Sequence, residues 1–297
     1  QGQDGCLEFQ GKPASYFDLF RVSGSDATNN KEQFGWAVDI TDKSMIVGAP
    51  FSGSEFQAAG TGSVFLFDKQ SSGDWGLVEE IKNPYPLGTA GTGDFFGVSV
   101  GITSYQSEYF AIVGSPYDDN KDSGSPTDTG LVQVYEKDFN TTTGQISWAA
   151  STGGLYSGSA TNDKYGGNVA IYRNYAALNS SEDPGTYPGG FSSARGVVYI
   201  KKYDGAQWND EAVISGSHAA FDVGAFGEPV YIPSVPSTHK MISFGGNKIA
   251  VGDRTATDGS TTVGSVTIFS SGSASGWTVE AVLTGSDSTS GASYSSP

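Results

Sequence analysis

The feature that most constrains the fold of this chain is an internal repeat that spans most of its 297 residues. A pair formed by an aromatic residue and a glycine begins a run with apolar residues at alternating positions four times, at intervals of 62, 69 and 61 residues. The pairs are Phe34-Gly35, Phe96-Gly97, Tyr165-Gly166 and Phe226-Gly227. Repeats of this length are single supersecondary units that bury a core only by packing on their neighbours, so one array of similar units is expected.

Each pair is followed by three further segments that are typical of strands. The first is a short apolar run that ends in a turn, in segments 46–50, 112–116, 177–180 and 250–253. The second is a glycine with apolar residues two and four positions later, beginning at Gly62, Gly130, Gly196 and Gly264. The third contains a tryptophan: Trp75, Trp148, Trp208 or Trp277. Alternation with a period of two predicts half-buried strands.

Four short antiparallel strands in about 60 residues are the content of one propeller blade. The sequence therefore predicts an all-β fold, a β-propeller-like array of four-stranded antiparallel blades, with a large two-sheet sandwich as the alternative. Glycine supplies 42 of the 297 residues. That fraction is about twice the usual ~7%, and many of these glycines fall at repeat positions.

At these residues the sequence resembles the FG-GAP repeat family, which builds the β-propeller heads of integrin alpha subunits and related extracellular proteins. The resemblance is closest at Phe34-Gly35 with Gly48-Ala49-Pro50 and extends over residues 34–283. It implies four blades, near residues 34–95, 96–164, 165–225 and 226–283, in an extracellular protein. In such blades the aromatic ring packs between neighbours, and its glycine permits a backbone approach at which a side chain would clash.

The calcium sites of that family are not carried over to this chain. The family holds calcium in a D-x-D-x-D-G loop after the first strand, where carboxylates converge on one ion. The matching segments 39–44, 105–108, 172–174 and 237–239 lack this ligand set, so no cofactor is required. A different loop offers Asp118, Asn120 and Asp122 at calcium-loop spacing. That loop is a candidate calcium site, and a solvated turn is the alternative.

The sequence offers little for catalysis, and we expect a protein that is not an enzyme. Its two histidines, His218 and His239, lie in polar connectors and are interpreted as surface residues. Motifs for acyl transfer, zinc proteolysis and phosphoryl transfer do not occur. Carboxylates that meet in space, as in a glycosidase, are the alternative that sequence leaves open.

The net charge of −16 excludes nucleic acid and anionic membrane surfaces as favoured partners. No apolar run approaches the ~20 residues of a membrane span, so membrane insertion is not expected. The chain begins at Gln1, which fits a secreted product whose targeting segment has been removed. Asn140 and Asn179 begin glycosylation sequons. These features favour an extracellular or cell-surface location.

A few aromatic residues beside proline or glycine are candidates for contact with a glycan or protein. An aromatic ring offers one apolar face and can serve as a stacking platform. The candidates are Tyr85, Tyr117, Tyr187 and Phe191, whereas most other aromatic residues occupy strand positions and are expected in the core.

The two ends of the chain carry an uneven number of strands. A Gly-Ser connector follows the tryptophan strands, and a further copy at residues 22–28 follows a strand-like segment that contains Tyr16, Phe17, Leu19, Phe20 and Val22. The chain therefore has five candidates for the fourth strand of a blade and four for each other strand. Residues 1–33 are interpreted as an N-terminal arm with this surplus strand, and 284–297 as a Ser-rich tail.

The surplus strand suggests an extracellular structural or adhesive protein that assembles with copies of itself by donating its N-terminal strand. Such a contact is heterologous and can propagate a filament. Cys6, the only cysteine, lies in the arm and could cross-link neighbours, or it is a buried unpaired thiol. The alternative is a monomeric propeller that binds glycans or extracellular proteins.

Overall fold

The computed structural model describes residues 33–52, 60–84, 93–119, 128–158, 160, 163–180, 196–215, 241–253, 264–272 and 276–284, together with four two-residue strands. These residues form strands, turns and bends and contain no helix. The structural statements below concern this part of the chain.

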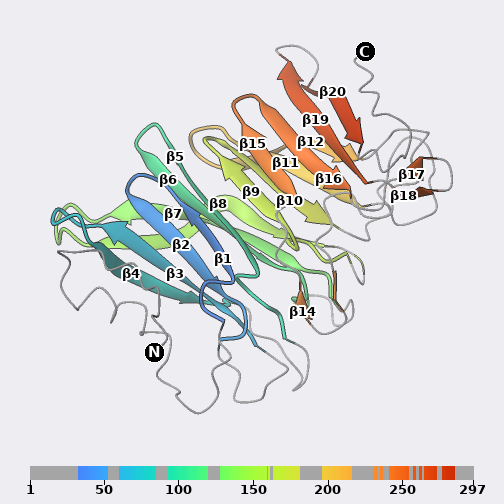
Figure 1. Ribbon diagram of the computed structural model, residues 1–297. Coiled ribbons are helices and arrows are strands. Elements are labelled where there is room, and N and C mark those ends of the chain that lie inside the picture. Colours follow the sequence, from blue (N-terminus) through green and yellow to red (C-terminus); the bar gives the residue numbers. More distant parts are fainter. Residues whose placement is uncertain are drawn as a thin grey trace, which may run out of the picture.

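The described strands form four four-stranded antiparallel sheets (Figure 1). The first sheet contains β1 (Ala37–Ile40), β2 (Ser44–Ala49), β3 (Ser63–Lys69) and β4 (Trp75–Lys82). The second contains β5 (Ser99–Tyr105), β6 (Glu108–Ser115), β7 (Leu131–Phe139) and β8 (Ile146–Ser157). The third contains β9 (Val169–Tyr172), β10 (Tyr175–Ser180), β11 (Val197–Tyr203) and β12 (Trp208–Ser215). The fourth contains β15 (Ile242–Gly245), β16 (Lys248–Asp253), β19 (Ser265–Gly272) and β20 (Gly276–Thr284).

Two short hairpins complete the described strands. One pairs β13 (Tyr231–Ile232) with β14 (Val235–Pro236), and the other pairs β17 (Thr257–Asp258) with β18 (Thr261–Thr262). Both belong to the fourth repeat, in which the chain between the aromatic-Gly pair and β15 is longer than in the other repeats.

The all-β prediction and the four four-stranded sheets are confirmed. In every sheet the strands lie in chain order, and the tryptophan segment forms the last strand. The surplus strand expected at residues 16–22 lies outside the described residues.

The middle strands of the first three sheets are mostly buried on both faces, so the prediction of half-buried strands was wrong for them. In the fourth sheet, β16 and β19 alternate buried with more exposed positions, as predicted. In β3, Val64 and Leu66 pack toward the second sheet, while Phe65 and Phe67 pack on the opposite face. All four side chains are buried. A strand that is covered on both faces does not need to alternate apolar and polar residues.

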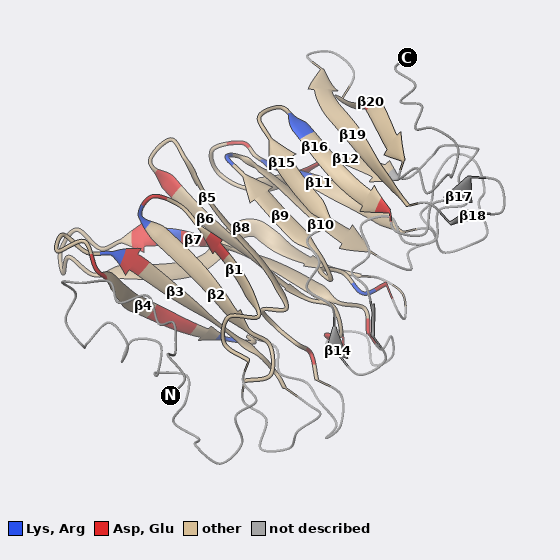
Figure 2. Ribbon diagram, in the orientation of Figure 1, with Lys and Arg blue, Asp and Glu red and all other residues tan. Residues whose placement is uncertain are grey.

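Three apolar cores lie between successive sheets. Ile46 of the first sheet packs in one core with Val100 of the second, and Phe110 of the second packs in the next core with Leu178 of the third. Ile200 of the third sheet packs with Ile249 of the fourth. Most of each strand in the four four-stranded sheets is uncharged (Figure 2). The sheets are thus held together mainly by burial of apolar surface.

The repeated glycines allow the sheets to approach closely. A Cβ atom added to Gly48 would lie 2.0 Å from the carbonyl oxygen of Gly97 in the next sheet. A Cβ atom on Gly114 would lie 2.0 Å from the carbonyl oxygen of Gly166. Phe96 is fully buried in the core between the first two sheets. At Phe96-Gly97 both expectations are therefore confirmed: the aromatic ring packs between two sheets, and the glycine allows a close backbone contact.

The four sheets stand side by side in one row, with β1–β4 at one end and β15–β20 at the other (Figure 1). The first strands β1, β5, β9 and β15 lie next to one another along the row. The described residues do not form a closed ring.

Candidate functional site

A cavity of about 510 Å³ lies where the ends of the four first strands meet. Residues 39–42, 102–104, 170–173 and 243–244 line it, so each of the four sheets contributes. This cavity exists because the repeat brings equivalent strand ends together from segments far apart in the sequence.

Some polar side chains of the cavity hold neighbouring first strands together. The carboxylate of Asp39 accepts a hydrogen bond from the backbone N–H of Ile102 in the next sheet at 3.0 Å. The hydroxyl oxygen of Thr103 accepts one from the backbone N–H of Arg173 in the third sheet at 2.8 Å. These two side chains therefore have a structural role.

Other polar side chains of the cavity are exposed. They are a carboxylate, a guanidinium group and two hydroxyls, from Asp42, Arg173, Ser104 and Ser243. The guanidinium carbon of Arg173 lies 5.7 Å from the ring centroid of Tyr105. A set of opposite charges and hydroxyls beside a ring can bind a polar ligand through hydrogen bonds.

A second cluster joins the first two sheets through buried acids. The side-chain amide of Asn83 donates to Asp94 at 2.9 Å and to Asp118 at 3.4 Å. All three side chains are almost fully buried. The hydroxyl of Ser115 donates to the backbone carbonyl of Asp94 at 2.8 Å. The cluster thus fixes the segment before Phe96 against the end of β6.

Burial raises the pKa of Asp94 from 3.8 to about 7 and that of Asp118 from 3.8 to about 7, because a buried carboxylate loses its hydration. The neighbouring carboxyl groups of Asp118, Asp119 and Asp128 raise the pKa of Asp94 further, and the hydrogen bond from Asn83 lowers it. The two acids therefore change charge near neutral pH.

The candidate calcium loop is described only in part. Asp118 contacts Asn83 in the buried cluster, while Asn120 and Asp122 lie outside the described residues. Within the described ranges no three or more histidine, cysteine, aspartate or glutamate residues form a group that could hold a metal ion. Calcium at this loop stays a prediction.

Among the candidate contact residues, only Tyr117 is described. Its ring is partly buried, packs edge-on against Phe95 with the centroids 5.4 Å apart, and has the Lys164 ammonium 6.0 Å from its centroid. It does not line the cavity. Tyr85, Tyr187 and Phe191 lie outside the described residues, as do Cys6, Tyr16, Phe17, Leu19, Phe20, Val22 and both histidines.

The two predicted glycosylation sites differ in exposure. Asn140 is exposed in the turn after β7, where its side-chain oxygen accepts hydrogen bonds from the backbone of Thr142 and Thr143. Asn179 is fully buried, and its oxygen accepts a hydrogen bond from the backbone of Asn168 at 2.6 Å. A glycan on Asn179 has no room in the folded protein, so this prediction is corrected: Asn179 takes the place in β10 that Gly114 has in β6.

Sequence reasoning missed the buried acids, although a signal was present. Asp94 and Asp163 each stand two residues before the aromatic residue of a repeat. Their backbone carbonyls accept equivalent hydrogen bonds, from Ser115 and from Ser180 at 2.7 Å. A repeated acid at a fixed offset could have indicated this structural position.

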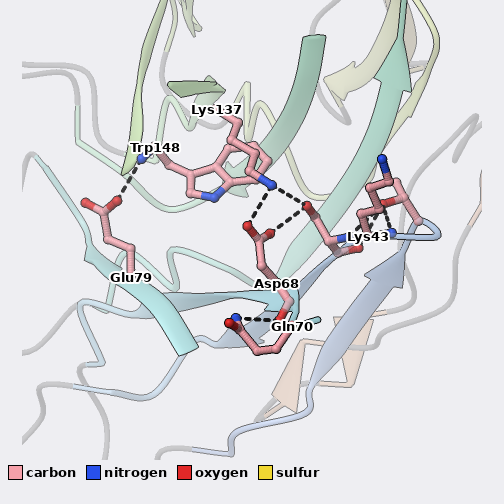
Figure 3. Close-up of polar contacts among 8 residues, drawn as sticks. Lys43, Asp68, Gln70, Glu79, Lys137 and Trp148 are labelled. Atoms are coloured by element: carbon pink, nitrogen blue, oxygen red, sulfur yellow. Dashed lines mark hydrogen bonds and ion pairs between the residues drawn. The ribbon is translucent and has the colours of Figure 1, made fainter. Parts of the chain in front are cut away.

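A buried ion pair also connects the first two sheets (Figure 3). The ammonium of Lys137 in β7 lies 2.7 Å from the carboxylate of Asp68 in β3, and the hydroxyl of Ser44 donates to the same carboxylate at 2.7 Å. The Lys137 ammonium also lies 4.8 Å from the centroid of the Tyr109 ring. Nearby, a carboxylate oxygen of Glu79 accepts a hydrogen bond from the backbone of Trp148 at 2.8 Å.

Comparison of the chain with models of known protein families and with curated proteins gives no match. In the part of the chain that the structure describes, no helix is long and apolar enough to cross a membrane.

Proposed function

We propose that this protein is a non-enzymatic structural or adhesive protein of the extracellular space that assembles with copies of itself. The observation that carries the proposal is the completeness of the four sheets: β4, β8, β12 and β20 each form the last strand of their own sheet. None of the four described sheets lacks a fourth strand that the segment around residues 16–22 would supply. In this proposal that segment pairs with a neighbouring molecule.

The shape of the assembly contact follows from the sheet edges. Each tryptophan strand is an edge strand, with one row of backbone N–H and C=O groups that no further described strand pairs. A donated strand would extend such an edge by β-strand addition, since no fourth-strand position is vacant. The resemblance to FG-GAP repeats supports a propeller-like form and an extracellular location.

Deletion of residues 1–22 tests this proposal. We expect the full-length protein to form particles of many chains and the truncated protein to have the mass of a single chain, measured by multi-angle light scattering. A full-length Cys6→Ser variant is the control, because it removes the thiol and keeps the strand. A truncated protein that assembles like the full-length protein would contradict a role of the N-terminal strand.

The cavity at the ends of the first strands favours a second candidate, a propeller that binds a glycan or another polar ligand. Asp42, Arg173, Ser104 and Ser243 present exposed charges and hydroxyls around about 510 Å³ of space. This volume falls in the range of small-molecule sites, roughly 300–1,000 Å³.

A glycan array tests this second candidate. Arg173→Ala is expected to weaken binding of a retained glycan at least about tenfold, which matches the loss of one charge-assisted hydrogen bond of about 1.5–3 kcal/mol. Lys82→Ala, at an exposed cation outside the cavity, is the matched comparison and is expected to bind like the unaltered protein. Equal binding by Arg173→Ala and the unaltered protein would exclude the cavity as the glycan site.

A further inference from the structure

We propose that the outward faces of the first and fourth sheets bind each other between two copies of the chain, head to tail. This inference rests on the proposed self-assembly and names the surfaces that carry it. In the interior of the row, a neighbouring sheet covers the positions that are equivalent to those on the two end faces.

The outward face of the first sheet leaves apolar side chains open at β1. The residue of each first strand that pairs with the position before the repeat glycine is Val38, Val100, Val169 or Ile242. Val100, Val169 and Ile242 are exposed by 6%, 2% and 0%, because the preceding sheet covers them, whereas Val38 is exposed by 64%. Ile40 is exposed in the same way, and its equivalents Ile102 and Ile171 are buried. Position 38 therefore has the same kind of apolar residue as the interior interfaces, but no sheet of the same chain covers it.

The rest of this outward face is also apolar. Val47, Phe65 and Phe67 form a buried cluster there, against which Phe34 and Trp75 pack. The most exposed apolar side chains on this face of the first sheet therefore belong to β1, the edge strand opposite β4.

The outward face of the fourth sheet shows the complementary pattern. The third-strand residue that pairs with the repeat glycine position is Val64, Val132, Val198 or Val266. The first three are exposed by 0%, because the following sheet covers them, whereas Val266 is exposed by 37%. Next to it on β20, Leu283 is exposed, while its equivalent Ile214 on β12 is buried.

The backbone contacts of the repeat glycines also differ between the interior sheets and the end sheets. Gly48 and Gly114 are each in contact with the carbonyl group of an aromatic-Gly glycine in the next sheet. Gly252 is the equivalent glycine of the fourth sheet, and the nearest atoms to a Cβ there belong to Met241 of the same sheet. At Gly35 of the first sheet nothing lies within 4 Å of a Cβ. Gly252 and Gly35 hold the two positions that contact each other between interior sheets, but within one chain they have no such contact.

The two end faces therefore match each other, since together they contain the parts of the interface that recurs inside the chain. They lie at opposite ends of the row within one copy (Figure 1). The partner that presents the missing half is a second copy. A contact between unlike faces is heterologous, so it builds a ring if the rotation closes and a helical filament if it does not.

Two charge substitutions test the pairing, with particle mass measured by multi-angle light scattering. Val38→Asp blocks the first-sheet face and Val266→Asp blocks the fourth-sheet face. Each variant alone is expected to have the mass of one chain, because assembly needs both the donated strand and the contact between the two unlike end faces, and each variant keeps only one intact face. Their equimolar mixture is expected to form a dimer with one chain of each variant. Phe139→Asp, at an exposed phenylalanine of β7 in the second sheet, is the matched control and is expected to assemble like the unaltered protein, because β7 is not an edge strand and lies on neither end sheet.

The outcomes separate this inference from the proposed function. If both variants assemble like the unaltered protein while deletion of residues 1–22 abolishes assembly, the end faces are excluded and self-assembly stands. If either variant alone forms a dimer, the contact joins like faces and the head-to-tail pairing is overturned. If the unaltered protein is a single chain, both proposals are overturned. Urea unfolding of each variant verifies that the monomer remains folded, as expected for changes at exposed positions.

Discussion

Replacement of Lys137 by methionine is expected to lower the free energy of unfolding by about 3–5 kcal/mol. The change leaves the carboxylate of Asp68 buried between the first and second sheets with the Ser44 hydroxyl but without its cationic partner. An unpaired buried charge loses its hydration without compensation, which is the main source of the cost. Urea unfolding measures the effect.

Two further variants serve as controls for the effect of Lys137→Met on the free energy of unfolding. Lys248→Met breaks the ion pair with Glu280, in which both side chains are more than two-fifths exposed, and is expected to cost at most about 1 kcal/mol. The double variant Asp68→Asn with Lys137→Met removes both charges and is expected to recover part of the loss. If Lys137→Met costs no more than Lys248→Met, the buried pair does not hold the two sheets together.

Stability is expected to rise as the pH falls from 8 to 4, through the buried pair Asp94 and Asp118. Both carboxyl groups have a pKa of about 7 in the folded protein and an ordinary value of 3.8, so the folded state binds protons more tightly than the unfolded state. A carboxyl group whose pKa differs in this way between the two states contributes about 4 kcal/mol to the free energy of unfolding. This contribution is fully present below pH 3.8 and is lost as the pH rises through 7. Because the two acids share Asn83, they titrate as a pair.

The variants Asp94→Asn and Asp118→Asn isolate this contribution in urea unfolding at pH 5, 6, 7 and 8. Each amide lacks the charge, so each variant is expected to be more stable than the unaltered protein at pH 8, by up to about 4 kcal/mol, and to depend less on pH. Asp42→Asn, at an exposed aspartate, is the control and is expected to leave the pH dependence unchanged. If Asp94→Asn keeps the full pH dependence of the unaltered protein, Asp94 does not titrate near neutral pH.

Much of the fold could be predicted because short sequence patterns that recur in each repeat determine it. The aromatic-Gly pairs, the apolar runs and the tryptophan segments each have a fixed place in the repeat, and those within the described residues each form a strand or turn. The prediction was weaker for the middle strands. Whether Phe65 is covered depends on what packs over the sheet, and the period of the sequence does not contain that information.

The candidate sites were less predictable, because they join residues from different repeats. Asp39 and Arg173 line one cavity although 134 residues separate them. Lys137 pairs with Asp68 across a sheet interface, and a search for local motifs does not bring them together. Asn179 satisfies the local pattern for a glycan, yet burial at a close approach of two sheets excludes one.

The sequence by itself determined the segments that form the four strands of each sheet and the order of the sheets along the chain. It could do so because turn glycines and apolar alternation act over a few residues. The tertiary structure alone decided which apolar positions are covered and which stay open. Val38 and Val100 are the same residue type at the same repeat position, and only the presence of a neighbouring sheet separates their exposure of 64% from 6%. Burial is a property of what packs on a residue, and that is set by the whole row of sheets.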